Sequence, residues 1–508
     1  MISKVACAAL MGIDAFKVDL EVDLARQGMP AFTMVGLAEG AVKESKERVF
    51  SALKNSGYRL PPSRITVNLA PADIRKAGSA YDLPLAVALL GAAGIIDQNL
   101  LEGWFLAGEL SLAGEVKPVH GVLSLALEAR KKGAKGLIVG ISNAHEAAVV
   151  EGLDVYGISS LSHLVKFLLS EETLEPTVVD TKKLWAGRQD FGLDFAEVKG
   201  QEHAKRAIEI GAAGNHNILF IGPPGSGKTM LAKRIPTVLP PLVFEEALEV
   251  TKIYSVSGQL DRDKALIVIR PFRSPHHTIS DAGMIGGGAY PKPGEVSLAH
   301  RGVLFLDELP EFKKNVLEVL RQPLEGGEVT ISRAAMSLSY PADFMLVAAM
   351  NPCPCGYYTD ERHACTCTPV AVQRYASRLS GPLLDRIDLQ IEVPAVDYKD
   401  LRGNKGLDSA TMRGNIERVR AIQAERYKDL SILTNSELSG SSLEKFCKLT
   451  EAEHVFLEQA VRSLGLSARA YTRILRIART IADLGEEETI KVPHLAEAIN
   501  YRSMDRQK

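Results

Sequence analysis

Hydrophobic positions along this chain gather in short runs bounded by glycine, proline and polar residues, a pattern typical of alternating strands and helices. Over residues 1–170, strand-like runs such as RITVNLAPADI alternate with helical runs such as LPLAVALLGAAGII. This pattern predicts one compact α/β domain. The periodicity is lost over residues 171–196, which we interpret as a linker.

Two further regions follow the linker. Residues 197–395 carry apolar runs that predict the buried strands of a second α/β domain. Residues 396–508 read as helical, with Thr450 as an N-cap, Ser467 as the N-cap of the next helix and Pro493 in the first turn of the last. We therefore expect two α/β domains followed by a helical one.

Composition limits the possible partners. The 508 residues carry a net charge of −2, so any contact with nucleic acid has to come from local basic elements. No apolar run approaches the roughly 20 residues of a membrane span, and the N-terminus lacks a signal-peptide pattern. We expect a cytoplasmic protein without membrane partners.

The most informative motif is a glycine-rich loop between a predicted strand, residues 217–221, and a helix. It fits Gly-x4-Gly-Lys-Thr, a loop whose backbone N–H groups surround a polyphosphate at a helix N-terminus. We expect Lys228 to reach the outer phosphates of ATP and Thr229 to ligate Mg²⁺. The loop consists of Gly222, Pro223, Pro224, Gly225, Ser226, Gly227, Lys228 and Thr229.

Two later strands end in polar residues. The run 303–306 delivers Asp307 and Glu308, and we expect Asp307 to hold Mg²⁺, directly or through water, and Glu308 to polarise the attacking water. The run 344–350 ends in Asn351, whose amide would orient water against the γ-phosphate. The plainer alternatives are solvated acids at a strand end and an Asn-Pro turn.

Arginines supply two further candidates. Arg386 lies between acids in residues 382–388 and suits an arginine finger that acts on a neighbouring subunit's γ-phosphate; the alternative is a surface salt bridge. Arg469 heads a predicted helix and is a candidate second phosphate sensor, a role for which Arg473 and Arg476 compete.

In this order, Gly200-Gln201, the phosphate loop, LFLDE, AAMNP, LLDRID and the C-terminal helices resemble an AAA+ ATPase. Two extra segments, one before LFLDE and a predicted β-hairpin after it (EGGEVTISRAAMSLSYPADF), resemble insertions of the magnesium-chelatase ATPase subunit and the MCM helicases. The strings FRSPHHT, GGG and CPCG are similar to the YifB/ComM group of magnesium chelatase-like proteins. The resemblance implies a homohexameric ATPase that moves along branched or single-stranded DNA, as a branch-migration helicase in recombination or natural transformation.

Residues 67–142 resemble a Lon-protease-type domain. Lon uses a Ser–Lys dyad whose lysine follows Gly-Gly-Leu, but here Leu123 stands in the lysine's place and Ser79 matches the nucleophile only loosely. A serine without a nearby amine is a poor nucleophile, so the resemblance implies this fold without peptidase chemistry. The expected fold class is α/β: an AAA+ P-loop ATPase core with a C-terminal helical lid, preceded by a Lon-protease-like N-terminal domain.

Four cysteines at paired spacing lie in a polar, loop-like stretch, which favours a structural Zn²⁺ over ordinary reduced thiols. They are Cys353, Cys355, Cys365 and Cys367. The two remaining cysteines, Cys7 and Cys447, are expected to be buried apolar residues.

Basic residues of the two insertions are the candidate DNA contacts, because six copies in a ring would line a pore. They are Arg270, Arg273, His276, His277 and Lys292 in the first insertion, and Arg333 near the hairpin turn. The alternative is that Arg273 and the histidines are structural. Three rival functions stay open: a motor for metal insertion into a tetrapyrrole, whose chelatase subunit is expected to lack the Lon-like domain, a MoxR-type remodelling chaperone, and an ATP-dependent protease, which Leu123 disfavours.

Overall fold

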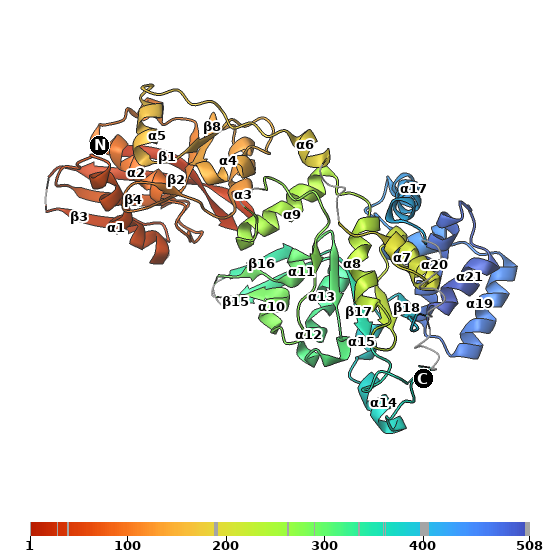
Figure 1. Cartoon of the computed structure of the whole chain (residues 1–508). Coiled ribbons are helices and arrows are strands. Elements are labelled where there is room, and N and C mark those ends of the chain that lie inside the picture. The colour runs from red at the N-terminus through yellow and green to blue at the C-terminus, as the bar shows by residue number, and fades with distance from the viewer. Residues whose placement is uncertain are drawn as a thin grey trace. The chain divides into compact units, whose positions relative to one another are not determined.

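A computed structural model describes residues 2–27, 29–37, 40–186, 192–261, 264–288, 290–333, 336–358, 360, 362–396 and 406–502. The chain divides into two compact units (Figure 1). The first unit comprises Met1–Gly187 and Phe244–Val268, and the second comprises Arg188–Val243 and Ile269–Lys508. Each unit has its own hydrophobic core.

The first unit is built on a seven-stranded mixed sheet with strand order β3-β4-β2-β1-β5-β8-β9. Its apolar helix α2 is buried along almost its whole length, because it packs against β1, β2 and β5. The elements are β1 Ile2–Met11, β2 Asp14–Ala25, β3 Ala31–Val35, α1 Gly40–Asn55, β4 Arg64–Ala70, α2 Asp82–Ala93, β5 Trp104–Ala107, β6 Glu109–Leu110, β7 Val116–Lys117, α3 Val122–Lys131, β8 Gly136–Gly140, α4 Ile141–Ala147, β9 Val155–Ile158, α5 Leu161–Leu168, α6 Thr181–Ala186 and α9 Phe244–Ser257.

The second unit contains a five-stranded parallel sheet with strand order β11-β14-β17-β10-β18, followed by C-terminal helices. The elements are α7 Glu202–Gly214, β10 Ile218–Ile221, α8 Lys228–Val238, β11 Phe272–Arg273, α10 Asp281–Ile285, β12 Gly286–Gly287, β13 Lys292–Pro293, α11 Glu295–Leu298, β14 Val303–Leu306, α12 Lys314–Val319, α13 Arg321–Gly326, β15 Glu328–Arg333, β16 Met336–Pro341, β17 Met345–Met350, α14 Pro369–Ala376, α15 Gly381–Leu384, β18 Leu389–Glu392, α17 Ser409–Tyr427, α18 Gly440–Phe446, α19 Glu451–Leu464, α20 Ala468–Leu484 and α21 Val492–Asn500.

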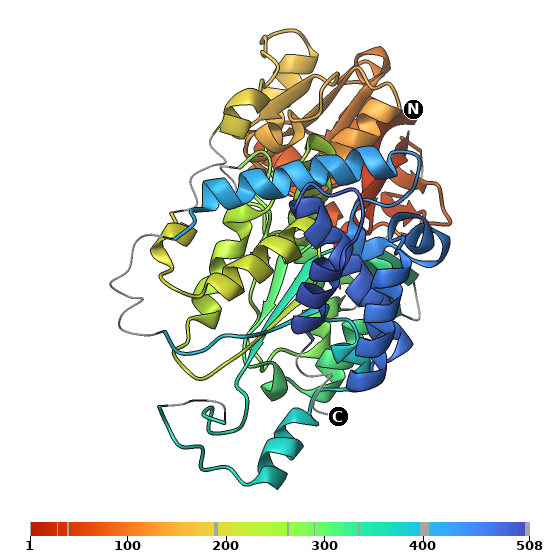
Figure 2. The ribbon, with the colours of Figure 1, turned by 90° about the vertical axis from the view of Figure 1, so that its right-hand side faces the viewer.

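The three strands that the sequence predicts around the candidate site are present as β10, β14 and β17. Every residue of β14 and β17 is buried, as the continuous apolar runs require in a parallel sheet covered on both faces. Helix α8 packs against β14 and β17, α7 packs against β18, and α17 contacts both helices. Figure 2 shows the long α17 beside the remaining C-terminal helices, in blue. A mixed α/β fold with a parallel sheet and a helical C-terminal region is therefore confirmed.

The predicted helix starts in the C-terminal region are also confirmed. Helix α19 begins after Thr450, which forms a capping box with Glu453, and α20 begins after Ser467, whose side chain accepts the N–H of Ala470. Pro493 lies in the first turn of α21. Local capping chemistry was sufficient to locate these starts because it depends on residues within one turn.

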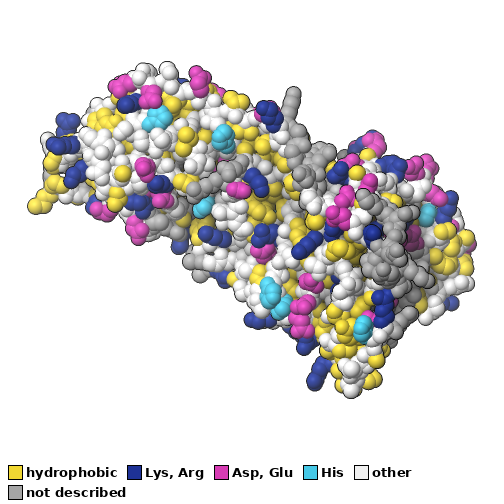
Figure 3. All heavy atoms as spheres, viewed as in Figure 1, with side chains coloured by type: hydrophobic (Ala, Val, Ile, Leu, Met, Phe, Trp, Pro, Cys, Tyr) yellow, Lys and Arg dark blue, Asp and Glu magenta, His cyan; other side chains and the backbone are white. Residues whose placement is uncertain are grey.

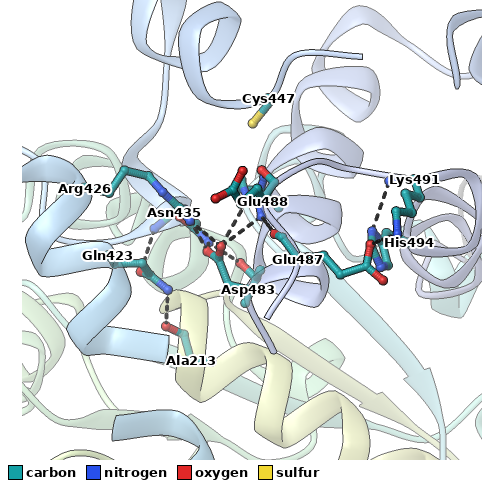
Figure 4. Close-up of polar contacts among 12 residues, drawn as sticks. Ala213, Gln423, Arg426, Asn435, Cys447, Asp483, Glu487, Glu488, Lys491 and His494 are labelled. Atoms are coloured by element: carbon teal, nitrogen blue, oxygen red, sulfur yellow. Dashed lines mark hydrogen bonds and ion pairs between the residues drawn. The ribbon is translucent and has the colours of Figure 1, made fainter. Parts of the chain in front are cut away.

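A buried carboxylate ties the C-terminal helices together (Figure 4). Asp483 accepts hydrogen bonds from Arg426 Nη1 at 2.9 Å, Arg479 Nε at 3.2 Å and Asn435 Nδ2 at 2.8 Å. The side chain of Asp483 is 1% exposed, so the loss of a partner would leave an uncompensated buried charge. This network joins α17 to α20 and fixes the helix that carries Arg469.

The two insertions pack together. Strands β15 and β16 form the predicted hairpin, with Arg333 opposite Met336 at its end. The hydroxyl of Tyr340 donates to the carbonyl oxygen of Pro291 at 2.6 Å, and the side chain of Ile331 lies against Gly286. The hairpin and the β12–β13 pair of the first insertion therefore form one body.

Two segments lie elsewhere than a linear division of the chain suggests. Helix α6 lies within residues 171–196, where the sequence indicated only a linker. Residues Phe244–Val268, placed by sequence in the second α/β domain, pack with the first unit, where Leu248 contacts the core cluster that includes the apolar side of α3. An amphipathic helix does not reveal from its own sequence which core it covers.

On the face seen in Figure 3, acidic and basic side chains are interspersed over both units, so neither sign of charge forms a continuous patch there. In the described part of the chain, no helix is long and apolar enough to cross a membrane.

Candidate nucleotide site

The candidate residues follow the carboxyl ends of three adjacent parallel strands. The phosphate loop follows β10, Asn351 follows β17, and Asp307 and Glu308 follow β14. Ligands of open parallel sheets bind at this edge, because successive loops converge there. The strand order thus brings Lys228 and Asn351 together although they lie 123 residues apart in sequence.

Two glycines of the phosphate loop are required by geometry. Gly227 is the N-cap of α8 and has φ 91°, a left-handed conformation that favours glycine. A Cβ atom on Gly222 would overlap the carbonyl oxygen of Val393, which follows β18. The side-chain amide of Gln201 donates to the carbonyl oxygen of Pro394 at 2.6 Å and that of Ser226 at 3.4 Å, so it borders the same loop.

Lys228 lies inside the loop. Its ammonium group donates to the carbonyl oxygens of Gly222 at 2.7 Å and Pro223 at 2.8 Å, and lies 3.3 Å from Asn351 Oδ1. Burial lowers its pKa, and the nearby Asp307 carboxylate opposes this shift. The site therefore holds a partly desolvated cation at the loop, in contact with the candidate sensor Asn351.

The two candidate Mg²⁺ ligands lie in direct contact. The hydroxyl of Thr229 donates to Asp307 Oδ2 at 2.7 Å, although 78 residues separate them. The other oxygen of Asp307 accepts the N–H of Glu308 at 2.9 Å. A hydroxyl and a carboxylate held side by side are the hard oxygen ligands that Mg²⁺ takes alongside phosphates and waters. The donor set therefore fits Mg²⁺.

Glu308 has a partner that sequence reasoning missed. Its Oε2 lies 3.3 Å from Nδ1 of His277, which follows the two-residue edge strand β11 and stacks against His276 with ring centroids 4.1 Å apart. Strand β11 pairs in parallel with β14, so the chain leaving it passes the residues that follow β14. Glu308 itself has φ 53°, an uncommon conformation for a residue with a side chain. The pairing of residues 272–273 with residues 303–304 is what brings His277 to Glu308. It could not be predicted from the sequence, because a two-residue strand directly after Pro271 has no recognisable strand pattern.

The arginine candidates form a separate group. Arg386 donates to Glu325 and to the carbonyl oxygen of Pro382, so within one chain it forms a salt bridge, and its partner is 61 residues away rather than a flanking acid. Arg469 Nη1 lies 3.0 Å from Asp385, the residue before Arg386. Arg473, largely buried, lies 3.9 Å from the same carboxylate.

Of the arginines that compete with Arg469, Arg473 also lies 3.5 Å from Asp388, and Arg476 donates to the carbonyl oxygen of Leu438 at 2.6 Å. Both are engaged in holding the fold of the helical region. Arg469 is exposed over 69% of its side chain, so it is the arginine of the three that is accessible to a ligand.

The four clustered cysteines meet in space. Their sulfur atoms all lie within 4.8 Å of one another, and those of Cys353, Cys355 and Cys365 are 3.3–3.7 Å apart. Sulfur atoms about 2.3 Å from one tetrahedral zinc are separated by about 3.8 Å. Backbone N–H groups of Tyr357 and Thr366 lower the pKa of Cys355 to about 5. Against a backbone hydrogen bond at each, burial and the neighbouring thiols raise the pKa of Cys365 and that of Cys367, so the sulfur positions and not the pKa values carry the case for a metal. Cys7 and Cys447 are buried, as expected.

Most basic residues of the first insertion have structural partners. Arg273 forms a two-pronged ion pair with Glu295, both contacts at 2.7 Å, and Arg270 donates to the carbonyl oxygens of Pro240 and Arg301. The structural alternative therefore describes both arginines. Lys292 and Arg333 are exposed.

Leu123, which stands where a Lon-type domain would carry its catalytic lysine, is inaccessible to solvent. Leu123 is fully buried, and its N–H donates to Glu146 Oε1 at 2.9 Å. Glu146 also accepts from Ser255 of α9 and lies 3.3 Å from Asn143 Nδ2. Lys76, the lysine nearest in sequence before Ser79, is buried and donates to the carbonyl oxygen of Pro71.

Comparisons with known proteins agree with this geometry. Family models match residues 194–401 ("Magnesium chelatase, subunit ChlI"), 20–143 ("Subunit ChlI of Mg-chelatase") and 406–502 ("Magnesium chelatase, subunit ChlI C-terminal"). Competence protein ComM of Haemophilus influenzae is 46% identical over 98% of this chain and 97% of its own length, and YifB of Escherichia coli is 45% identical over 99% and 98%. The chain belongs to the YifB/ComM family of magnesium chelatase-like AAA+ ATPases.

Membership of this family implies ATP hydrolysis with ATP and Mg²⁺ as cofactors. The 38 kDa magnesium-chelatase subunit of Rhodobacter capsulatus is 26% identical over only 31% of this chain and 50% of its own length. One model with a chelatase description covers part of the N-terminal region, so the presence of that region does not by itself argue against a chelatase role.

Proposed function

We propose that this YifB/ComM-family protein is a homohexameric ATPase that couples ATP hydrolysis to movement along branched or single-stranded DNA, as a branch-migration helicase. The observation that carries the chemistry is the contact between Thr229 and Asp307 beside Lys228 and Glu308. DNA as the track is supported by the near full-length similarity to a protein named for competence.

At the nucleotide, each side chain has one role. Lys228 exchanges the loop carbonyls for the outer phosphates of ATP, and Thr229 and Asp307 hold Mg²⁺, which neutralises phosphate charge when bound. Glu308 takes a proton from the attacking water, while Asn351 orients that water or the γ-phosphate. The contact between Asn351 and Lys228 places the sensor beside the phosphate-binding cation.

Arg386 and Arg469 act together on the neighbouring subunit's nucleotide. Arg469 forms an ion pair with Asp385, the residue directly before Arg386, so we expect one subunit interface to present both arginines. In the single chain Arg386 is held by Glu325, and assembly exchanges this carboxylate for the γ-phosphate. In this proposal the Arg386–Glu325 salt bridge is the arrangement of the arginine finger before the subunits assemble.

The two insertions supply the DNA contacts. The β15–β16 hairpin and the β12–β13 pair form one body, and Arg333 and Lys292 are exposed on it, whereas Arg270 and Arg273 hold its base. Six such bodies around a pore give sequence-independent phosphate contacts without an overall positive charge.

ATPase stimulation by DNA tests this function. A Holliday junction or forked duplex should raise turnover of the wild type, and Arg333→Ala should reduce stimulation and unwinding while basal turnover persists. It should also flatten the dependence of DNA affinity on salt. Arg462→Ala, which removes an exposed arginine of α19, is the matched control. Stimulation that is unchanged in Arg333→Ala would contradict the hairpin's role.

The alternative is a metal-chelatase-type or protein-remodelling motor without DNA activity, and the chelatase descriptions of the three matching family models favour the former. The same assay separates them: stimulation by a porphyrin-chelatase partner, or by neither partner nor DNA, would replace the helicase proposal.

We expect the protein in the cytoplasm. We also expect the first unit, a Lon-like fold without peptidase chemistry, to serve ring assembly or partner docking.

Zinc is the third cofactor of this proposal, after ATP and Mg²⁺. The four sulfur atoms are spaced for one tetrahedral ion, so elemental analysis should find about one zinc per chain. Cys353→Ser and Cys365→Ser should each lose it, whereas Cys447→Ser, which changes a buried cysteine outside the cluster, should retain it. Metal-free protein that is folded and active would favour ordinary thiols.

A further inference from the structure

The segment that carries the four clustered cysteines, described at residues 353–358, 360 and 362–368 and here called the cysteine loop, touches the phosphate loop. Gly356, which follows the second clustered cysteine, has φ +90° and lies so close to Pro224 that a Cβ atom on it would meet Pro224 Cδ at 2.6 Å and Cγ at 2.8 Å. Real Cβ atoms essentially never approach backbone or ring atoms this closely. The backbone of the cysteine loop therefore packs directly against the ring of a phosphate-loop proline.

The position of Gly356 is set by the cysteines. Its N–H donates to the carbonyl oxygen of Cys353 at 3.0 Å, which closes a tight turn containing Cys355. The sulfur atoms of these two cysteines lie 3.3 Å apart and 3.6–3.7 Å from that of Cys365. An ion bound to these sulfur atoms would fix the turn, and with it the surface presented to Pro224.

A second contact runs through Asn351. Its side-chain carbon lies 3.8 Å from the position of a Cβ on Gly356, and its Oδ1 lies 3.3 Å from Nζ of Lys228. Only Pro352 separates Asn351 from the first cysteine. The cysteine loop thus borders both the proline that shapes the phosphate loop and the residue that contacts its lysine.

The geometry points to the cysteine loop as a positioning element of the nucleotide site: with its metal bound, it holds Pro224 and Asn351 in the arrangement that binds ATP. This inference rests on the proposed zinc site and extends it, because it makes nucleotide affinity depend on an ion that does not touch the nucleotide.

The experiment measures zinc content, thermal stability and affinity for a fluorescent ADP analogue on the full-length protein. Gly356→Ala should retain zinc and weaken nucleotide binding about tenfold, since overpacking at a tight contact costs enough for such a change. Pro224→Ala in the same chain removes the two ring atoms, so the double variant should recover most of the affinity. Gly465→Ala is the matched control, because Gly465 has φ +62° but open space at its Cβ; its affinity should equal that of the wild type.

Cys365→Ser supplies the metal arm: it should lose zinc and also bind nucleotide less tightly, whereas added zinc should restore neither property. Normal nucleotide affinity in Gly356→Ala, or a loss that Pro224→Ala does not recover, would overturn the inference. If Gly356→Ala also loses zinc, unchanged affinity in folded, zinc-free Cys365→Ser would overturn it. A wild type that is folded, binds nucleotide and contains no zinc would overturn both the metal site and the dependence of nucleotide affinity on it, and the Gly356 and Pro224 variants would then test only the contact between the loops. Lys228→Ala separately tests nucleotide binding by the phosphate loop.

Discussion

The N-termini of two helices, α8 in the second unit and α3 in the first, show how one structural element serves two purposes. At α8 the chain enters through a glycine-rich loop, and the charged groups nearby are Lys228 and Asp307, which accepts a hydrogen bond from the Thr229 hydroxyl. At α3 the first N–H groups are taken by the buried carboxylate of Glu146, which accepts from Leu123. One end is shaped for an anion from solution, and at the other a carboxyl group of the fold already accepts the N–H of Leu123.

The difference lies in the side chains around each end. Both helices begin after a glycine with positive φ, Gly227 and Gly121. The first unit has a buried glutamate and a leucine at this helix end, whereas the second unit has a lysine and the hydrogen-bonded pair of Thr229 and Asp307. A helix N-terminus therefore becomes a ligand site only when the protein does not supply its own carboxylate.

The largest expected effect tests whether the α8 site is completed by another subunit. Arg386→Ala should bind ATP normally but hydrolyse it about 10³-fold more slowly, the lower end of what arginine fingers contribute. Mixing it with Lys228→Ala subunits should restore some turnover, because mixed interfaces then carry one intact finger and one intact loop. Arg418→Ala, which breaks an exposed ion pair of α17, is the control. Unchanged hydrolysis in the assembled Arg386→Ala ring would remove the finger.

A somewhat smaller loss separates binding from chemistry at the same helix end. Glu308→Gln should retain ATP binding and lose roughly 10²–10³-fold in turnover, because the amide does not accept the proton of water. Lys228→Ala should instead weaken nucleotide binding itself. Turnover and equilibrium binding of a nucleotide analogue measure the two quantities. Near-normal hydrolysis by Glu308→Gln would show that the catalytic role is misassigned.

His277 provides a finer test. If its ring orients Glu308, His277→Ala should lower kcat about fivefold with little change in KM, a modest effect because both side chains are partly exposed. His276→Ala, which removes the neighbouring exposed ring, should have no comparable effect on kcat. Equal losses in the two variants would indicate that the pair only supports the local backbone.

The smallest effect concerns the closed end at α3. Burial raises the pKa of Glu146, against hydrogen bonds from Ser255 and Leu123 that lower it. Stability from the protonated group is therefore complete below the unfolded-state pKa and is lost as the pH rises through the folded-state value. Glu146→Gln resembles the protonated form, so relative to this variant the wild type should lose stability between acidic and neutral pH.

Tryptophan fluorescence measures this selectively, because both tryptophans, Trp104 and Trp185, lie in the first unit. A change of 1 kcal/mol would shift the melting temperature by about 2–4 °C. Exposed Glu151, changed to glutamine, should show no pH-dependent difference from the wild type. A difference for Glu146→Gln that does not vary with pH would argue that the carboxyl is not protonated in the fold.

Features that depend on residues close together in the chain could be predicted from the sequence. The phosphate loop, the buried strands that end at Asp307 and Asn351, the hairpin and the caps at Thr450 and Ser467 each depend on residues close together in the chain. The roles assigned to these residues stay predictions. Partners set by tertiary packing were not accessible: Glu325 for Arg386 and His277 for Glu308 come from elements whose neighbours no local pattern specifies.

Helix α9 has a consequence for how the two units are inherited. The chain leaves the second unit after Val243, contributes α9 to the first, and returns at Ile269, so the backbone passes between the units three times. A gene fragment that begins after residue 196 would carry α9 without α3 and without the core cluster against which Leu248 packs. Such a fragment would expose the apolar side of α9 and tend to aggregate. Recombination at the first passage between the units, after Gly187, would therefore separate α9 from the unit with which it packs. We expect the two units to be inherited together.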